Sequence, residues 1–584
     1  MRFNTLKQMA VRKAAVFSLC ALAVNAAMAL TLLENINGYS VGADSKLHQF
    51  QALAIGDDGK ILAVGSQAAV TATLATGKIG RRLDLQGQTM LPGLIDAHGH
   101  VLDLGFVANA LELRTSKTLP QALQMIAAYG KAHPQQAWIT GFGWNQAVWQ
   151  LGRFPTAKEI DSVLAQRPVY LERVDGHAGW ANSRAMQLAG INKNTPDPVG
   201  GKIERDADGN PTGVLVDKAG ALVSHLIPPA SQAESRAALD AALQQLAQAG
   251  LTSVHDAGVD VAGDALYREY AGQGKLTTRV YAMIRGVGKD FDALSKNGPL
   301  NSFADDRYAL RAVKLFADGA LGSRGAALLQ PYADAPASSG LLFVDAATMR
   351  KQVATAADKG YQVNVHAIGD AANAQVLDAF ASLQPGGESA DGGAKAGRGA
   401  IAATAHANGS DARHRIEHAQ VVALADIPRF KQLSVIPSMQ PVHATSDKNM
   451  AEARVGPQRI LGAYAWRSFL QQGSRIACGS DFPVESPNPF EGMHAAVTRQ
   501  DAAGDPVGGW YPQQAMSVLE ALRCFTLDAA YAAHQEQSLG SLEVGKWADF
   551  VLVDRDLFKI PTYEIHKIQV LQTWVGGKPV FVRK

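Results

Sequence analysis

The sequence has few cysteines, no excess of either charge and, beyond its first thirty residues, no long hydrophobic run. Only three of its 584 residues are cysteine, too few for the disulfide framework of a small secreted domain. The 55 Lys and Arg residues nearly balance the 53 Asp and Glu residues. Such a chain has no basic field to hold a phosphate backbone, so we expect no nucleic-acid partner and a small-molecule substrate instead. With 47% hydrophobic and 18% charged residues, the composition is that of a globular enzyme, not of a disordered or fibrous protein.

The first thirty residues differ in composition from the rest. Basic residues up to Lys13 precede an apolar run at residues 14–24, and the small residues Ala27 and Ala29 follow. This order is typical of a secretory signal peptide, which we assign to residues 1–29. A membrane anchor is the alternative, but the apolar run is far shorter than the roughly 20 residues that span a bilayer. We therefore expect an exported protein, periplasmic or secreted, without a membrane span in its mature chain.

Two cysteines remain after residue 29, Cys478 and Cys524, and a bridge between them cannot be deduced from sequence. Cys478 lies three positions before Asp481, an odd spacing that points the two side chains to opposite faces of a regular strand. We expect Cys478 to be a core residue and not a metal ligand.

Both ends of the chain carry short strand patterns. Residues 50–55 and 60–64 flank a turn rich in Gly and Asp, which predicts a hairpin, and residues 548–554, 568–574 and 579–582 are strand-like near the other end. Neither end has enough strands to bury a core alone. We therefore predict that residues 30–89 and 540–584 pair into one small β-sandwich.

Residues 90–539 alternate short Val- and Ile-rich strands with amphipathic segments rich in Ala and Leu, the pattern of parallel βα units. A (β/α)8 barrel of the TIM type or an open α/β sheet would fit. The region holds more than eight candidate strands, the first at residues 89–95, so some lie outside a barrel. We predict an insertion near residues 168–232, which contain a hairpin-like pattern. Residues 385–411, dominated by Gly, Ala, Ser and Asp, are predicted to form a flexible loop without chemistry.

Several of these strands end on residues that bind hard or borderline metals. They are His98, His100, Lys314, His366, His418 and Asp481. The carboxyl ends of parallel barrel strands converge on one face, so residues far apart in sequence meet there. A single histidine at a strand end is more often structural, but four histidines and an aspartate placed alike predict a metal site. Lys314 could equally pair with a carboxylate such as Asp318.

These runs resemble the motifs of a known family. Residues 91–100, LPGLIDAHGH, closely resemble the opening signature of the amidohydrolase superfamily. The runs at 313–324, 366–370, 415–419 and 479–483 are similar to the amidohydrolase 3 branch, which includes N-substituted formamide deformylase-like proteins. The resemblance covers nearly the whole mature chain. It implies a metal-dependent hydrolase with a (β/α)8 barrel that cleaves non-peptide carbon–nitrogen bonds.

The resemblance also implies roles for the residues and one or two divalent ions, with zinc expected. His98 and His100 would hold one ion, His366 and His418 a second position, and Asp481 would be both ligand and proton acceptor. In a site with two ions, Lys314 would be carboxylated and would bridge them. Zinc lowers the pKa of bound water to roughly 7 and polarises a carbonyl group, while Asp481 would pass the water proton to the leaving nitrogen.

Other residues have two interpretations each. His177 and His255 could orient or polarise the substrate, or could be structural; Arg324 is a further polar candidate. Trp144, Trp149 and Trp180 could line an apolar pocket or belong to a core. An esterase, lactonase or phosphotriesterase would use the same ions and carboxylate, and a noncatalytic exported barrel that binds a ligand is the alternative from a different class. Against the latter, each expected ligand position is filled.

Overall fold

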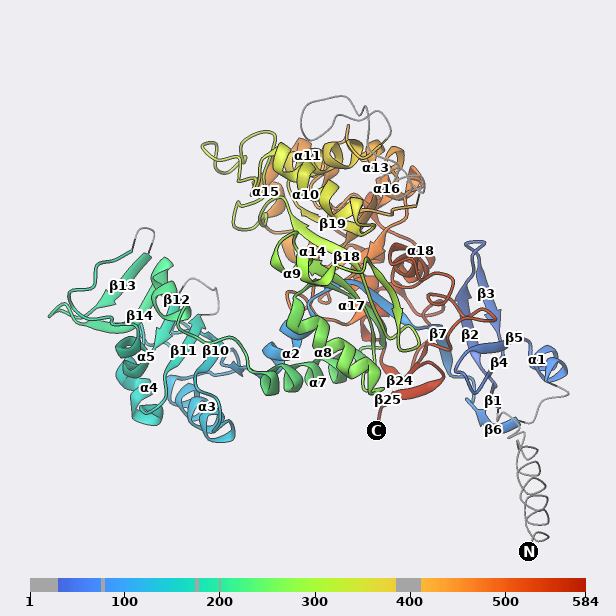
Figure 1. The fold of residues 1–584 in the computed structure, drawn as a ribbon, viewed down its shortest axis with the longest axis horizontal. Helices are drawn as coiled ribbons and strands as arrows, with labels where there is room; N and C mark the ends of the chain where they lie inside the picture. The colour runs from blue at the N-terminus through green and yellow to red at the C-terminus, as the bar shows by residue number, and fades with distance from the viewer. Residues whose placement is uncertain (1–29, 75–78, 174–177, 199–200, 385–410) are drawn as a thin grey trace, which may run out of the picture. The chain divides into compact units, whose positions relative to one another are not determined.

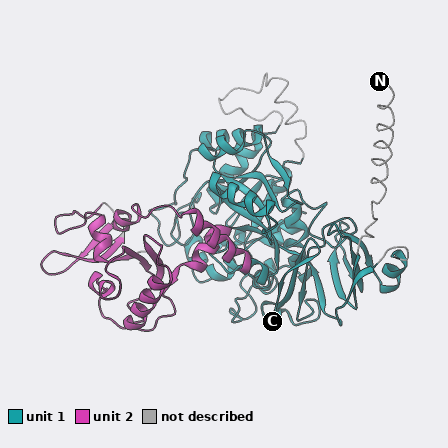
Figure 2. Ribbon diagram, turned by 60° about the horizontal axis from the view of Figure 1, so that its bottom comes forward, with its two compact units in different colours: residues 1–99, 245–584 teal, residues 100–244 magenta. Residues whose placement is uncertain are grey.

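The structure is a computed structural model that describes residues 30–74, 79–173, 178–198, 201–384 and 411–584 (Figure 1). The predicted signal peptide, His177 and all but the last residue of the predicted loop 385–411 lie outside the described residues. In the part of the chain that is described, no helix is both long and apolar enough to cross a membrane. The chain divides into two compact units, residues 1–99 with 245–584, and residues 100–244 (Figure 2).

Eight parallel strands within the described residues form the central sheet of the first unit. In sheet order they are β8 (Leu94–Gly99), β15 (Leu251–Val259), β16 (Arg279–Arg285), β18 (Tyr308–Phe316), β19 (Gln362–Ala367), β20 (Arg415–His418), β21 (Ile436–Met439) and β22 (Ala477–Cys478), with β17 (Leu300–Phe303) antiparallel beside β18. A bridge between Gly99 and Phe482 and a hydrogen bond of 2.7 Å from Asp481 N to His98 O connect the first strand to the last. The sheet is therefore a nearly closed barrel, which confirms the predicted α/β class and TIM-type barrel.

The strands of this barrel are buried almost throughout, as parallel strands covered on both faces must be. The helices of the first unit are α1 (Gln67–Thr73), α8 (Val261–Gly272), α9 (Lys289–Leu294), α10 (Ala346–Asp358), α11 (Asp370–Ala381), α13 (Ile427–Gln432), α14 (Pro441–Asp447), α15 (Ala451–Arg459), α16 (Trp466–Gln471), α17 (Pro489–Thr498), α18 (Val518–Cys524) and α19 (Leu527–Ala532). Side-chain caps start several of them: Asp260 accepts a hydrogen bond from Gly263 N at α8, and Asp345 accepts one from Thr348 N at α10.

Strands from both chain ends combine in one sheet. Its order within the described residues is β25 (Lys578–Val582), β24 (Val570–Val575), β23 (Phe550–Val553), β7 (Thr89–Pro92), β2 (Asn37–Val41) and β3 (Leu47–Phe50). A second sheet has the order β5 (Ile61–Gly65), β4 (Ala52–Ile55), β1 (Leu30–Glu34) and β6 (Ile79–Asp84). The predicted hairpin is confirmed as the antiparallel pair of β4 and β5. One hydrophobic cluster contains residues of both sheets, among them Leu53, Met90, Phe550 and Trp574.

The predicted single strand at residues 89–95 is wrong, because the structure divides it at Gly93. β7 belongs to the sheet of the chain ends, whereas β8 begins the barrel. A Cβ atom at Gly93 would lie 2.2 Å from Thr252 Oγ1, so only glycine fits where the chain passes from one sheet to the other. The apolar residues on both sides of Pro92 and Gly93 do not by themselves reveal such a change of sheet.

The second unit has its own sheet and core. Its strands, in order, are β13 (Gly201–Arg205), β14 (Pro211–Asp217), β12 (Ala178–Ala181), β11 (Val169–Arg173), β10 (Ile139–Trp144) and β9 (Leu111–Glu112), and its helices are α2 (Val101–Asn109), α3 (Leu119–Ala132), α4 (Ala157–Leu164), α5 (Ser183–Leu188), α6 (Ala221–Ser224) and α7 (Gln232–Gln248), the last of which continues into residues of the first unit. Residues 168–232, the predicted insertion, lie inside this larger unit. Trp144, Trp149 and Trp180 contact one another in its hydrophobic cluster, so they are core residues.

Candidate metal centre

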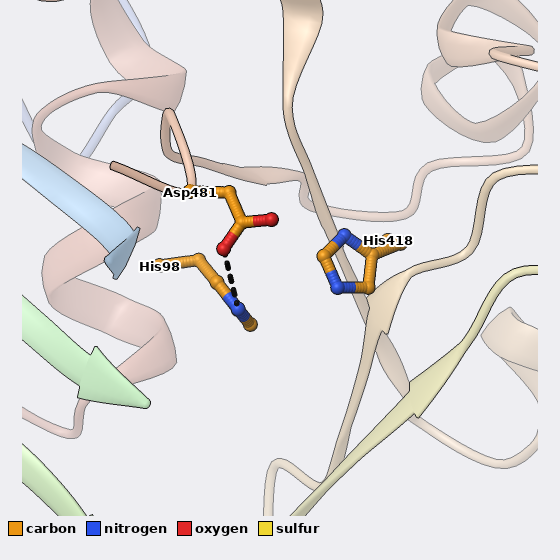
Figure 3. A group of neighbouring side chains, drawn as sticks. All are labelled: His98, His418 and Asp481. Atoms are coloured by element: carbon orange, nitrogen blue, oxygen red, sulfur yellow. Dashed lines mark ion pairs between the residues drawn. The ribbon is translucent and has the colours of Figure 1, made fainter. Parts of the chain in front are cut away.

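Three of the predicted ligands meet at the carboxyl end of the barrel (Figure 3). His98 is on β8, His418 ends β20, and Asp481 lies three residues after β22. One ligand atom from each lies within 4.8 Å of the other two, and all three residues are buried. His98 Nε2 is 3.5 Å from Asp481 Oδ1. In Figure 3 the dashed ion pair joins the Asp481 carboxylate to the His98 ring, and the ring of His418 lies beside them.

His366, near the end of β19, lies beside this cluster. Its ring centroid is 4.6 Å from that of His418. Its Nε2 atom is 3.6 Å from Asp318 Oδ1 and has no hydrogen-bond partner among the described residues. The Asp318 carboxylate accepts hydrogen bonds from the backbone N–H groups of Ala327, Ile368 and Gly369, and burial raises its pKa to about 7.

Lys314 points into the same group of residues from β18. It is fully buried, and its Nζ atom lies 3.1 Å from His98 Nε2. Burial lowers the pKa of Lys314 to about 8. The pairing with Asp318 considered from the sequence is absent from the ion pairs of the described residues; Lys314 contacts His98 instead.

The remaining sequence candidates fall elsewhere. His100 directly follows β8 as the N-cap residue of α2; it is counted with the second unit and is not in the three-residue cluster. Arg324 forms an ion pair of 2.9 Å with Asp334 in the segment after β18. His255 is fully buried in the barrel with Nδ1 2.9 Å from Arg415 Nη1. Because a guanidinium group only donates, His255 accepts this hydrogen bond.

His98 is held by a buried ion pair between Glu417 and Arg415. The sequence patterns did not reveal this pair. Glu417 Oε2 is 2.5 Å from His98 Nδ1, and Glu417 Oε1 is 2.8 Å from Arg415 Nε. Arg415 also donates to Ala97 O and Ser438 Oγ, at 2.5 and 2.8 Å. Burial raises the pKa of Glu417, but the charge of Arg415, the hydrogen bond with His98 and the charge of Lys314 together outweigh it and hold this pKa well below its usual value.

These hydrogen bonds orient the ring nitrogens. Glu417 is an acceptor, so Nδ1 of His98 carries the proton and Nε2 presents its lone pair to the cluster. Gln440 Oε1, 2.8 Å from His418 Nδ1, has the same effect on His418. Burial lowers the pKa of His98 to about 4 and that of His418 well below its usual value, so both rings are neutral near pH 7.

Asp96 fixes the position of the loop that carries Asp481. Its carboxylate accepts hydrogen bonds from Ser480 Oγ at 2.6 Å, from Ser480 N and from His98 N. Asp481 and His418 both have left-handed backbone conformations, with φ of 62° and 74°. Such conformations are costly for residues other than glycine and are concentrated at functional sites.

His443 also borders the site, and the pattern of strand ends could not find it because it lies on helix α14. Its Nε2 atom is 3.9 Å from Asp481 Oδ2, and its ring is 6.0 Å from that of His418. The one sequence signal is its position four residues after β21, a strand of the barrel.

Comparison with known proteins identifies the family. A sequence model of the amidohydrolase family, that of its amidohydrolase 3 branch, matches residues 81–581, which is most of the chain. The chain belongs to the amidohydrolase family. This confirms the resemblance drawn from the motifs.

Relatives of this amidohydrolase match it over most of their length. The amidohydrolase YtcJ of Bacillus subtilis is 32% identical over 90% of this chain and 95% of its own. The N-substituted formamide deformylase of Arthrobacter pascens is 30% identical over 89% of this chain and 93% of its own. A metal-dependent hydrolase of Pyrococcus horikoshii has a similar structure, with a TM-score of 0.74 and 25% identity over 91% of this chain and 99% of that chain. The protein is thus a hydrolase of a metal-dependent family.

The donor set of this amidohydrolase fits a divalent cation. Two neutral imidazoles and a carboxylate are ligands that zinc and similar ions accept, and three such groups converge within the distance that one ion can bridge. His366 adds a buried ring nitrogen that has no hydrogen-bond partner in the described part of the chain, as expected of a further ligand.

Proposed function

We propose that this amidohydrolase uses water to cleave a non-peptide carbon–nitrogen bond, in an amide, a formamide or a cyclic amide. The convergence of His98, His418 and Asp481 within 4.8 Å carries this proposal. These residues, with His100 and His366, would hold one or two divalent ions, and zinc is the metal we expect. A bound ion of this kind polarises the scissile carbonyl group and lowers the pKa of water.

The chain's own residues supply the proton transfers. The Asp481 carboxylate takes a proton from the attacking water and then delivers it to the nitrogen of the leaving group, which needs that proton to depart as an amine. Glu417 holds His98 in the required tautomer. His177 remains a candidate for orienting the substrate carbonyl group.

We also propose that Lys314 becomes carboxylated when two ions bind. Its neutral amine would add to carbon dioxide, forming a carbamate and releasing one proton. Its burial and its position next to His98 support this, because burial favours the neutral amine and a carbamate would place two oxygen atoms among the ligands.

Outside the site, we propose that residues 1–29 direct export and that the two sheets of the chain ends stack as a β-sandwich. A disulfide between Cys478 and Cys524, both buried, supports export, because such bonds persist in oxidising compartments. Cys478 is a core residue, as predicted. The hydrophobic cluster shared by the two sheets supports the sandwich.

Elemental analysis and a panel of amides test the function. The purified protein should contain one or two equivalents of a divalent metal. Asp481→Asn should lower kcat by about a thousandfold or more without loss of folding, since it removes the proton acceptor. Asp505→Asn, a change at an exposed aspartate, is the matched control and should leave kcat unchanged.

Lys314→Ala separates the two possible ion counts. Two equivalents of metal that fall to one or none in this variant would support a carboxylated bridge, whereas a single equivalent that survives would assign Lys314 another role. Preparations without any metal, or turnover that persists in Asp481→Asn, would contradict the proposed mechanism. Hydrolysis of esters or phosphotriesters without any hydrolysis of amides would overturn the assignment to carbon–nitrogen bonds.

A further inference from the structure

Three consecutive large apolar side chains are exposed after β18. Leu341, Leu342 and Phe343 have exposed fractions of 64%, 37% and 53%, and Phe316, the last residue of β18, is 43% exposed. We call these four residues the apolar rim. Single exposed apolar residues are ordinary, but an exposed run of this kind indicates a binding surface.

The apolar rim is continuous with the candidate metal centre. Phe316 lies two positions after Lys314, so the two side chains share a face of β18. The Phe316 ring centroid is 5.5 Å from that of His366 and 5.0 Å from Lys314 Nζ. A hydrogen bond of 2.8 Å from Phe343 N to Ala317 O holds Phe343 beside the end of the same strand. Phe316 therefore borders the ligand cluster, and the segment that carries the rest of the rim passes beside the end of the same strand.

The order of the barrel strands indicates which part of a substrate would reach the rim. β18, which carries Phe316, and β22, which precedes Asp481, are four places apart in either direction around the eight-stranded barrel of the described residues. They therefore lie on opposite sides. In the proposed reaction Asp481 protonates the leaving nitrogen, so that nitrogen faces β22. The acyl substituent on the planar carbonyl carbon points away from the nitrogen and hence toward β18.

We infer that the substrate carries an extended apolar acyl group, which the apolar rim binds. This inference rests on the proposed function and narrows it, from amides in general to N-acyl compounds whose acyl part is longer than formyl or acetyl. Hydrolysis forms a bond from the water oxygen to the acyl carbon, breaks the bond from that carbon to nitrogen and transfers a proton to the nitrogen. The products are an apolar carboxylate and an amine.

A pair of chromogenic anilides tests the inference on the metal-loaded, full-length protein. 4-Nitrohexananilide and 4-nitroacetanilide differ by four methylene groups, each of which changes affinity by about fourfold when fully buried. We expect kcat/KM for the hexanoyl compound to exceed that for the acetyl compound by about tenfold or more, because the rim buries the chain only partly. Leu341→Ser and Phe343→Ser should reduce this ratio about fivefold and leave the acetyl compound and the metal content unaffected. Val544→Ser, at an equally exposed position outside the rim, should change neither.

Binding of the carboxylate products gives a readout that does not need turnover. Hexanoate should bind the metal-loaded protein about tenfold more tightly than acetate by calorimetry, and Leu341→Ser should remove most of that difference. If no anilide is hydrolysed but this binding pattern holds, the apolar subsite stands and the proposed reaction fails. If anilides are hydrolysed without a preference for hexanoyl, or with a preference that the rim variants do not change, the inference is overturned. It is also overturned if sedimentation shows that the rim variants turn a dimer into a monomer, since a second copy of the chain would then occupy the rim.

Discussion

His98 makes contacts at both of its ring nitrogens. The contact between its Nδ1 atom and Glu417 can be tested directly. Glu417 links His98 to the guanidinium group of Arg415 in a fully buried chain. We predict that Glu417→Gln, which keeps an acceptor for His98 Nδ1, retains the fold and weakens metal binding by about tenfold. Glu417→Leu should weaken metal binding further and cost about 3–5 kcal/mol of unfolding free energy, because it leaves the charge of Arg415 buried without a partner.

The control for this prediction is the double variant Arg415→Met with Glu417→Leu, which removes both charges. It should be destabilised by less than the sum of the two single changes. Competition with a chelator measures metal affinity, and denaturant titration measures stability. Wild-type metal affinity in Glu417→Leu would rule out a positioning role for this carboxylate.

His534, away from the candidate metal centre, should make stability depend on pH. Burial, aided by the charges of Arg311 and Arg413, lowers the pKa of His534 to about 4. In the unfolded chain the histidine binds a proton below about pH 6.5, while in the folded protein it stays neutral until about pH 4. Protonation of the unfolded chain therefore does not reduce the stability of the fold above pH 6.5. It reduces this stability progressively as the pH falls from 6.5 to 4. The unfolding free energy should decrease by up to about 3 kcal/mol over this range.

The variant His534→Asn removes this titration and keeps a residue that tolerates the backbone φ of 57°. Its unfolding free energy should decrease less steeply between pH 6.5 and 4 than that of the wild type. His48→Asn, at a side chain that is 56% exposed, is the control for replacing a histidine by asparagine in itself. Parallel curves for His534→Asn and wild type would contradict the prediction.

At the level of the elements, the junction of β7 and β8 depends on Gly93. A Cβ atom there would meet Thr252 Oγ1 at 2.2 Å and Thr252 Cγ2 at 2.7 Å. Gly93→Ala should therefore destabilise the protein by about 1–3 kcal/mol through overpacking. Thr252→Ala removes both of these atoms and should recover part of the loss when combined with Gly93→Ala. Gly288→Ala, where a Cβ atom would meet nothing within 4 Å, is the control in the same denaturant experiment. A double variant no more stable than Gly93→Ala would show that the contact with Thr252 is not the cause.

The elements also show what the sequence could predict of the site and what it could not. His98, His418 and Asp481 could be found because each lies at or just after the end of a recognisable barrel strand, and parallel strands bring their carboxyl ends together. His443 could not, because it reaches the cluster from helix α14, whose position depends on packing. Glu417 could not be assigned a role either, since its partner His98 is 319 positions away and no local pattern records that contact.

For the whole molecule, the strand patterns predicted parallel βα units and the contribution of both chain ends, because each depends on local alternation. The choice of a barrel over an open sheet came from the resemblance to the amidohydrolase family. The second unit was harder to delimit. Its strands β9 and β10 look like further βα units in the sequence. Only the pairing of β9 with β10, and of β10 with β11, shows that they belong to a different sheet. The hydrophobic period and the composition of a segment indicate whether it is a helix or a strand. The partner of a strand in its sheet is decided by contacts between residues far apart in the sequence.

A buried ion pair links the barrel to the chain ends. Arg279, the first residue of β16, donates from Nε and Nη2 to the carboxylate of Asp549, just before β23, at 2.7 and 3.1 Å. Asp549 Oδ1 also accepts a hydrogen bond of 2.7 Å from Gly576 N, and the Arg279 guanidinium carbon lies 4.8 Å from the Trp547 ring centroid. This bidentate pair joins a barrel strand to the sheet made by the two chain ends.

We therefore predict that Arg279→Met costs about 3–5 kcal/mol, because Asp549 keeps a buried charge that has lost its partner. Arg279→Met combined with Asp549→Leu removes both charges and should recover at least half of that loss. Arg429→Met, which breaks a partly exposed pair with Asp378, should cost less than about 1 kcal/mol. Calorimetry adds a test of coupling: in Arg279→Met the chain-end sheets should unfold before the barrel, in a separate transition that the wild type does not show. If the two single losses simply add in the double variant and the transition stays single, the barrel and the chain ends are held together by their apolar contacts and not by this pair.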